Sequence, residues 1–182
     1  MDKQVFIING HNGVGKDTFV DMVEGALRNV DISLWIENYS SVTRVKEIAR
    51  KCGWNPEVKT ERDRKFLSDL KLLLTEYNDL PFKDLGYVVE GFLHDGFEKS
   101  KMLFLHIREP EEIAKAAKPF NAKTILVTRD SAEHVVSNMA DKNVFNYDYD
   151  IIVENNGTFE ELQEKANLFV NDYINGSFRE KY

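Results

Sequence analysis

The chain has 182 residues, of which 42% are apolar and 30% charged, and 24 Lys and Arg against 31 Asp and Glu give a formal net charge of −7. This balance excludes the broad basic face of a nucleic-acid-binding protein, and no run approaches the roughly 20 apolar residues of a membrane span. The single cysteine, Cys52, rules out an intrachain disulfide. The first apolar run is too short for a signal peptide. We therefore expect one cytoplasmic domain over residues 1–182, monomeric or homodimeric, with no nucleic-acid or membrane partner.

Short apolar runs alternate with amphipathic stretches along the chain. The runs predict strands at residues 4–9, 32–38, 102–107, 124–128 and 149–153. Helical periodicity predicts helices at about 15–29, 42–52, from Thr60 onward, 79–99, a short one before Pro119, and one opened by a Thr158–Glu161 capping box. The tail 177–182 is predicted to fray. Such alternation predicts an α/β fold with a five-stranded parallel sheet between two layers of helices.

The first predicted strand runs into a glycine-rich segment, Gly10 to Thr18, and then into a helix. Gly10, four residues and then Gly15-Lys16 is the spacing of a phosphate-binding loop between strand and helix. Glycines let backbone N–H groups curl around a phosphate, and the helix directs its positive end at the same anion. We predict that this loop binds the phosphates of ATP through the following residues: Asn12, Gly13, Val14, Gly15, Lys16, Asp17 and Thr18.

Ligands of parallel sheets bind at the carboxyl ends of the strands. This rule places the loop, Ser40, Arg108, Arg129 and Asn155 at one edge. Phosphoryl transfer requires converging positive charge, and the candidates are Arg44, Lys46, Arg64, Arg108 and Arg129. The alternatives are a pairing of Arg108 with Glu112 and a solvated helix charge at Arg64, with Arg62 as the rival of Arg64. Residues 130–147 form a candidate lid, because their periodicity is weak.

The sequence Gly-Lys-Asp-Thr at residues 15–18 resembles the loop of phage-type deoxynucleoside monophosphate kinases and animal-type phosphomevalonate kinases. Residues 41–54, 60–70, 106–113 and 150–162 also resemble segments of that group or of related nucleoside monophosphate kinases and dephospho-CoA kinase. The resemblance implies a P-loop kinase fold, ATP and Mg²⁺ as cofactors, and three sets of residues. Lys16, Arg108 and Arg129 would assist transfer; Arg44, Lys46, Arg64 and Arg108 would bind the acceptor; Asp17 would bind the metal and Asn155 the donor adenine.

His106 departs from the family pattern, because the resembling kinases usually carry an Asp at this strand end. A neutral imidazole does not replace a carboxylate beside Mg²⁺, which prefers oxygen. Asp17 then carries more of the metal site, or transfer is weak, or the chain binds nucleotide without turnover. The leading function is phosphoryl transfer from ATP to a nucleoside or deoxynucleoside monophosphate. Dephospho-CoA or phosphomevalonate as acceptor, and a regulatory nucleotide-binding protein, are the alternatives.

Overall fold

The computed structural model describes residues 2–58, 60–94, 99–131 and 143–182. Five strands form one parallel sheet, as predicted, and their order is β2-β3-β1-β4-β5. The strands are β1 (Gln4–Asn9), β2 (Trp35–Ser40), β3 (Ser100–His106), β4 (Lys123–Thr128) and β5 (Ile151–Glu154). The helices are α1 (Lys16–Val30), α2 (Thr43–Lys51), α3 (Glu61–Asn78), α4 (Leu80–His94), α5 (Pro110–Ala117) and α7 (Phe159–Asn175).

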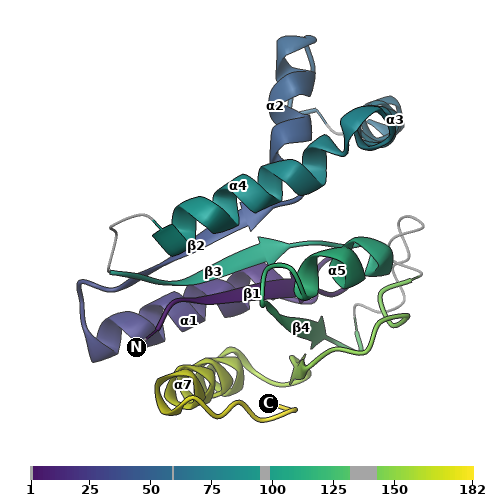
Figure 1. The fold of residues 1–182 in the computed structure, drawn as a ribbon. Coiled ribbons are helices and arrows are strands. Elements are labelled where there is room, and N and C mark those ends of the chain that lie inside the picture. Colours follow the sequence, from purple (N-terminus) through teal and green to yellow (C-terminus); the bar gives the residue numbers. More distant parts are fainter. Residues whose placement is uncertain (1, 59, 95–98, 132–142) are drawn as a thin grey trace.

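Helices cover both faces of the sheet, so the protein has three layers (Figure 1). Alternate residues of β1 point to opposite faces, as in any strand. Phe6 and Ile8 pack with α1 and α7 in one hydrophobic cluster, whereas Val5 and Ile7 pack with α4 and α5 in the other. No helix among the described residues is long and apolar enough to cross a membrane.

The predicted start of β2 is wrong, and α3 lies away from the hydrophobic core. β2 begins at Trp35 and not at Ile32, which is 82% exposed, because the Asp31 carboxylate accepts hydrogen bonds from the N–H and hydroxyl of Ser33 and holds a turn. The helix predicted from Thr60 onward is confirmed as α3, but no residue of this helix is buried, so its apolar side chains do not enter the core. α3 stands beyond the sheet with α2, next to α4 (Figure 1).

A further difference concerns the last helix. The helical periodicity after Thr158 predicts that Phe159 faces the core, but this residue is 65% exposed, because it occupies the first turn of α7. The end predicted for α4, at about Lys99, depends on residues 95–98, which lie outside the described chain; the described part of the helix runs to His94, and β3 begins at Ser100. The capping box of Thr158 and Glu161 is confirmed.

The tail does not fray but continues the sheet beside β5. Ile152 donates its N–H to the Glu180 carbonyl at 2.7 Å and accepts from the N–H of Tyr182 at 2.9 Å. Buried Asp172 of α7 then holds the tail in place, since it accepts two hydrogen bonds from Arg179, at 2.6 and 2.9 Å, and one from the Tyr182 hydroxyl at 2.7 Å. These bonds link α7 to the edge of the sheet.

We expect Asp172→Asn to lower the free energy of unfolding by about 2 kcal/mol, because Arg179 loses its charged partner. The hydrogen bonds from Arg179 lower the pKa of Asp172 below its usual 3.8. Its contribution to stability is therefore present above about pH 3.8 and is lost as the pH falls through the lower, folded-state pKa. Urea unfolding at pH 7 and pH 3 measures both effects. Glu164→Gln, at an exposed position of the same helix, is the control and should leave the transition unchanged; an equal loss in both variants would contradict the assignment.

Candidate phosphate-binding site

The glycine-rich loop lies between the carboxyl end of β1 and the start of α1. Gly10, Gly13 and Gly15 have positive φ angles of 147°, 82° and 94°, a region that glycine enters without a side-chain clash. Gly15 is the N-cap of α1, and no side chain caps the helix there. The first N–H groups of α1 are thus available to an anion.

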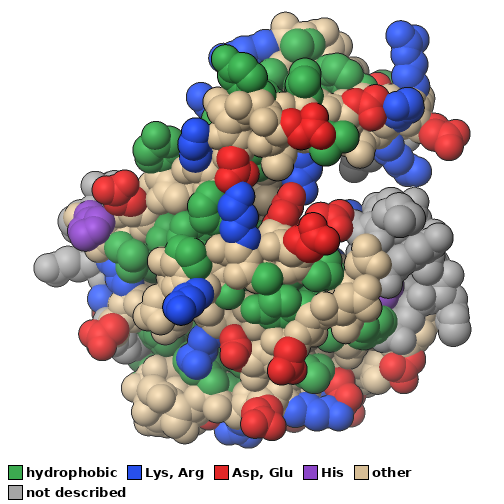
Figure 2. Space-filling view, turned by 45° about the vertical axis from the view of Figure 1, so that its right-hand side comes forward, with side chains coloured by type: hydrophobic (Ala, Val, Ile, Leu, Met, Phe, Trp, Pro, Cys, Tyr) green, Lys and Arg blue, Asp and Glu red, His purple; other side chains and the backbone are tan. Residues whose placement is uncertain are grey.

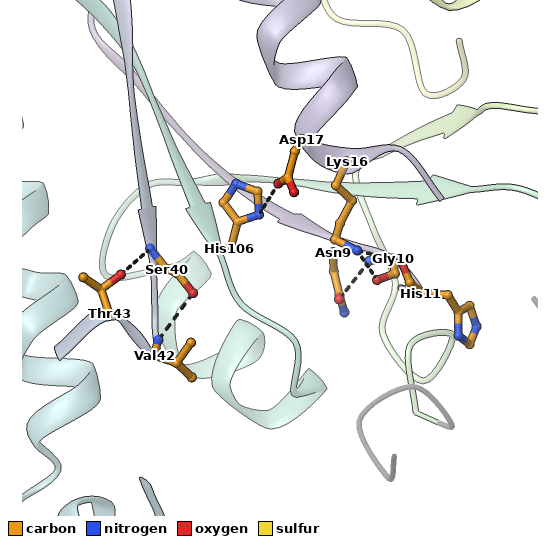
Figure 3. Close-up of polar contacts among 9 residues, drawn as sticks. All are labelled: Asn9, Gly10, His11, Lys16, Asp17, Ser40, Val42, Thr43 and His106. Atoms are coloured by element: carbon orange, nitrogen blue, oxygen red, sulfur yellow. Dashed lines mark hydrogen bonds and ion pairs between the residues drawn. The ribbon is translucent and has the colours of Figure 1, made fainter. Parts of the chain in front are cut away.

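Lys16 is folded back over the loop. Its Nζ donates to the carbonyls of Gly10 at 2.6 Å and His11 at 2.7 Å (Figure 3). A lysine at this position brings a positive charge to the space enclosed by the loop. Of the other predicted loop residues, Asn12, Gly13 and Asp17 are exposed, Thr18 is partly exposed and Val14 is buried.

Two asparagines fix the loop against the sheet. Asn155, which follows β5, donates from its side chain to the carbonyl of Val14 at 2.8 Å and is buried. Asn9 is fully buried; its side-chain oxygen Oδ1 accepts from the Gly10 N–H, and its side-chain Nδ2 donates to the Arg108 carbonyl and the Tyr149 hydroxyl. The structure thus gives Asn155 a role in holding the loop, beside its predicted contact with adenine.

His106 ends β3 directly beside the loop. Its Nδ1 lies 3.8 Å from Oδ1 of Asp17 (Figure 3), and its Nε2 is buried without a hydrogen-bond partner among the described residues. Burial lowers the pKa of His106 below 6.5, an effect that Lys16 and Arg108 reinforce and that Asp17 partly offsets. The imidazole is therefore neutral at pH 7.

NMR titration of the His106 ring should give a pKa below 6.5, and Asp17→Asn should lower that pKa further, because Asp17 favours the charged form. Since the unfolded chain binds this proton at higher pH, the stability contributed by neutral His106 is present above pH 6.5 and declines as the pH falls below it. Long-range ¹H–¹⁵N spectra, with His106→Asn to assign the signal, measure the pKa. A value above 6.5 would contradict the burial of this ring.

The predicted arginines and lysine lie on several elements. Arg108 follows β3 and Arg129 follows β4, so both stand at the predicted edge of the sheet, and both are exposed. Arg44 and Lys46 lie on α2 and Arg64 on α3; Arg44 pairs with Glu47 at 2.9 Å. The alternative partner of Arg108, Glu112, is bound by Lys71 at 2.6 Å instead. The roles of these cations in binding stay predictions.

A cleft of about 630 Å³ lies beside the carboxyl ends of β2 and β3. Among the described residues its walls include apolar side chains of Pro81, Phe82 and Leu85. Its charged lining consists of Asp79, Glu109, Glu111, Glu112 and Lys115. Figure 2 shows a hollow below the upper helices with acidic side chains at its rim. None of the four predicted acceptor-binding residues is among the described residues of the lining.

The candidate lid at 130–147 is described only in part, since residues 132–142 lie outside the described chain. Its described end packs on the site. The ring of Phe145 lies 5.4 Å from that of His11, and Tyr149, just beyond, donates its hydroxyl to the carbonyl of Val144 at 2.9 Å. The segment 143–149 therefore packs against the glycine-rich loop at His11.

Comparison with solved structures places this geometry in a known fold. A candidate kinase from Chloroflexus aurantiacus aligns over 98% of this chain and 100% of its own, with a TM-score of 0.50 and 14% identity. The chain has the three-layer α/β/α fold of the P-loop kinases. At 14% identity, the two proteins share an architecture, and the comparison says nothing about the substrate of this chain.

Two other structures are similar at lower TM-scores, which support no further argument. TT1252 from Thermus thermophilus aligns at 0.44, with 18% identity over 94% of this chain and 98% of its own. A thymidylate kinase from Ehrlichia chaffeensis aligns at 0.35, with 11% identity over 97% of this chain and 89% of its own. No family model and no curated protein sequence matches the chain.

Sequence reasoning missed two residues of the site. Asn9 was read only as the end of a strand, although a buried amide after an apolar run signals a structural polar contact. His11 was read as a loop position, yet it is 4% exposed, and its Nδ1 has no hydrogen-bond partner among the described residues. No local sequence signal predicts its burial, because Phe145 covers it from a distant part of the chain.

Proposed function

We propose that this protein transfers the γ-phosphoryl group of ATP to a small acceptor. The observation that carries the proposal is the glycine-rich loop, which turns through three positive-φ glycines into the uncapped start of α1 with Lys16 beside it. This is an arrangement suited to a polyphosphate, because backbone N–H groups, the helix dipole and one ammonium group converge on it.

The roles of the surrounding residues follow from the chemistry of phosphoryl transfer, which depends on alignment and charge compensation. Lys16 would contact the β- and γ-phosphates, and Arg108 and Arg129 would neutralise charge at the transferred group. Asp17 would hold the divalent cation, because its side chain is 87% exposed at the start of α1. When bound, the cation supplies further charge neutralisation between the phosphates.

A nucleoside or deoxynucleoside monophosphate is the first candidate acceptor, as the resemblance of residues 15–18 implies. Its phosphate is ionised at neutral pH and needs no general base. Arg44, Lys46, Arg64 and Arg108 would bind it. Dephospho-CoA and phosphomevalonate are the related alternatives, and nucleotide binding without transfer is the regulatory one.

An acceptor with a free hydroxyl group is a second candidate, favoured by the charge of the cleft. Four carboxylates and one lysine are among its described lining residues. Their net negative charge disfavours a phosphate, whereas carboxylates accept hydrogen bonds from hydroxyl groups. Glu109 is partly buried there, and burial raises its pKa, so it is suited to accept a proton from a hydroxyl group.

Coupled ADP release over a panel of acceptors tests the proposal. The panel contains ribo- and deoxyribonucleoside monophosphates, dephospho-CoA, phosphomevalonate and neutral polyols, each with ATP and either Mg²⁺ or Mn²⁺. We expect one class to stimulate ADP release above the rate without acceptor. Stimulation by monophosphates alone would exclude the hydroxyl acceptor, and stimulation by polyols alone would exclude the monophosphate. ATP binding without stimulation by any acceptor would contradict transfer and favour the regulatory role.

A further inference from the structure

His106 and Asp17 bring two different metal-binding atoms to one place beside the loop. β3 holds His106 between Ile8 of β1 and Ser40 of β2 in register, and α1 holds Asp17 in its first turn. In Figure 3 the imidazole and the carboxylate point toward each other across the space next to Lys16. Two rigid elements therefore fix the pair.

The distance between the two groups fits a shared cation better than a direct contact. Nδ1 and Oδ1 are 3.8 Å apart, which is too long for a hydrogen bond. Two such atoms bound to one cation at about 2.1 Å each lie about 3.0–3.5 Å apart. The Asp17 side chain is 87% exposed, so it can close the remaining few tenths of an ångström.

The environment of the imidazole leaves its Nδ1 lone pair available. Nε2 is buried with no hydrogen-bond partner among the described residues, so no neighbour there fixes which nitrogen carries the proton. The tautomer with hydrogen on Nε2 presents an unprotonated Nδ1 to Asp17. Neutral imidazole in that form is a good ligand for first-row transition metals.

We propose that Asp17 and His106 together bind the divalent cation of the bound nucleotide and that this pair selects Mn²⁺, Co²⁺ or Zn²⁺ over Mg²⁺. Mg²⁺ prefers oxygen ligands, whereas imidazole suits the transition metals. No group of three or more His, Cys, Asp or Glu that could hold a metal occurs among the described residues; in the proposed site, phosphate oxygens and water complete the coordination. The inference rests on the proposed function in that the nucleotide supplies these oxygens.

Pulsed EPR of the full chain with Mn²⁺ and a non-hydrolysable ATP analogue tests this directly. We expect a ¹⁴N coupling from a bound imidazole in the wild type and its loss in His106→Asp. Calorimetry of the same analogue with Mn²⁺ and with Mg²⁺ should show the preference for Mn²⁺ falling about 10-fold or more in His106→Asp. His94→Asp, at an exposed histidine at the end of α4, is the matched control and should keep both properties.

The outcomes separate this inference from the proposed function. Analogue binding without nitrogen coupling, or coupling that persists in His106→Asp, overturns the inference and leaves the proposed function standing. Failure of the analogue to bind with either Mn²⁺ or Mg²⁺ overturns both. If His106→Asp does not fold, as judged by circular dichroism, His106→Asn takes its place, because the ring is removed there without a new charge.

Discussion

Lys16→Ala is expected to lower the rate of phosphoryl transfer about 100- to 1,000-fold, the usual effect of removing one stabilising group from a charged transition state. The lysine contributes the ammonium group nearest the loop, and its present partners are the backbone carbonyls of Gly10 and His11. ADP release with the acceptor identified by the panel measures the effect.

Arg28→Ala is the control for Lys16→Ala. Arg28 lies at the other end of α1, half exposed, and pairs with Glu24 at 2.7 Å. Because an exposed pair of this kind contributes little, its loss should leave activity and stability unchanged. Similar rates in wild type and Lys16→Ala, with both folded, would show that the loop is not the site of transfer.

Gly10→Ala is expected to destabilise the protein by about 3 kcal/mol or more, in the range of severe backbone and packing defects. A Cβ on Gly10 would lie under 3.0 Å from the carbonyl oxygen of Val127 in β4, and the φ angle of 147° is itself unfavourable for alanine. This oxygen belongs to the backbone of β4, so it cannot move aside as the end of a flexible side chain could. Thermal and urea unfolding measure the loss.

Gly13→Ala provides the matched comparison within the same loop. Gly13 also has a positive φ angle, 82°, but no heavy atom lies within 4 Å of the position of its Cβ. Only the conformational penalty applies, about 1 kcal/mol. Equal destabilisation by the two substitutions would contradict the close approach of β4 to Gly10.

The sequence predicted the parts of the fold that local signals determine. The boundaries of β1 agree with prediction, and the start of α7 is set by the Thr158–Glu161 capping box that the spacing indicated. The alternation of apolar runs and helices likewise predicted a parallel sheet, and with it the edge that gathers the loop, Arg108 and Arg129. Each of these depends on residues close together in the chain.

The errors arose where distant contacts decide the structure. The tail pairs with Ile152 and is anchored by Asp172, and the mostly polar sequence of residues 177–181 signals neither partner. Helical periodicity predicted α3 itself, but it does not reveal that this helix lies beyond the sheet, beside α2 and α4. For the site, the loop was predictable from spacing, whereas the proximity of His106 to Asp17 depends on the register of β3 beside β1.

A crystal structure with a non-hydrolysable ATP analogue and a divalent cation tests the central claim most directly. We predict that the triphosphate lies in the glycine-rich loop, with backbone N–H groups of residues 12–18 and the Lys16 ammonium group on its oxygens and the cation beside Asp17. A triphosphate bound elsewhere, with the loop empty and Lys16 still on the carbonyls of Gly10 and His11, would contradict the assignment of this loop as the phosphate site.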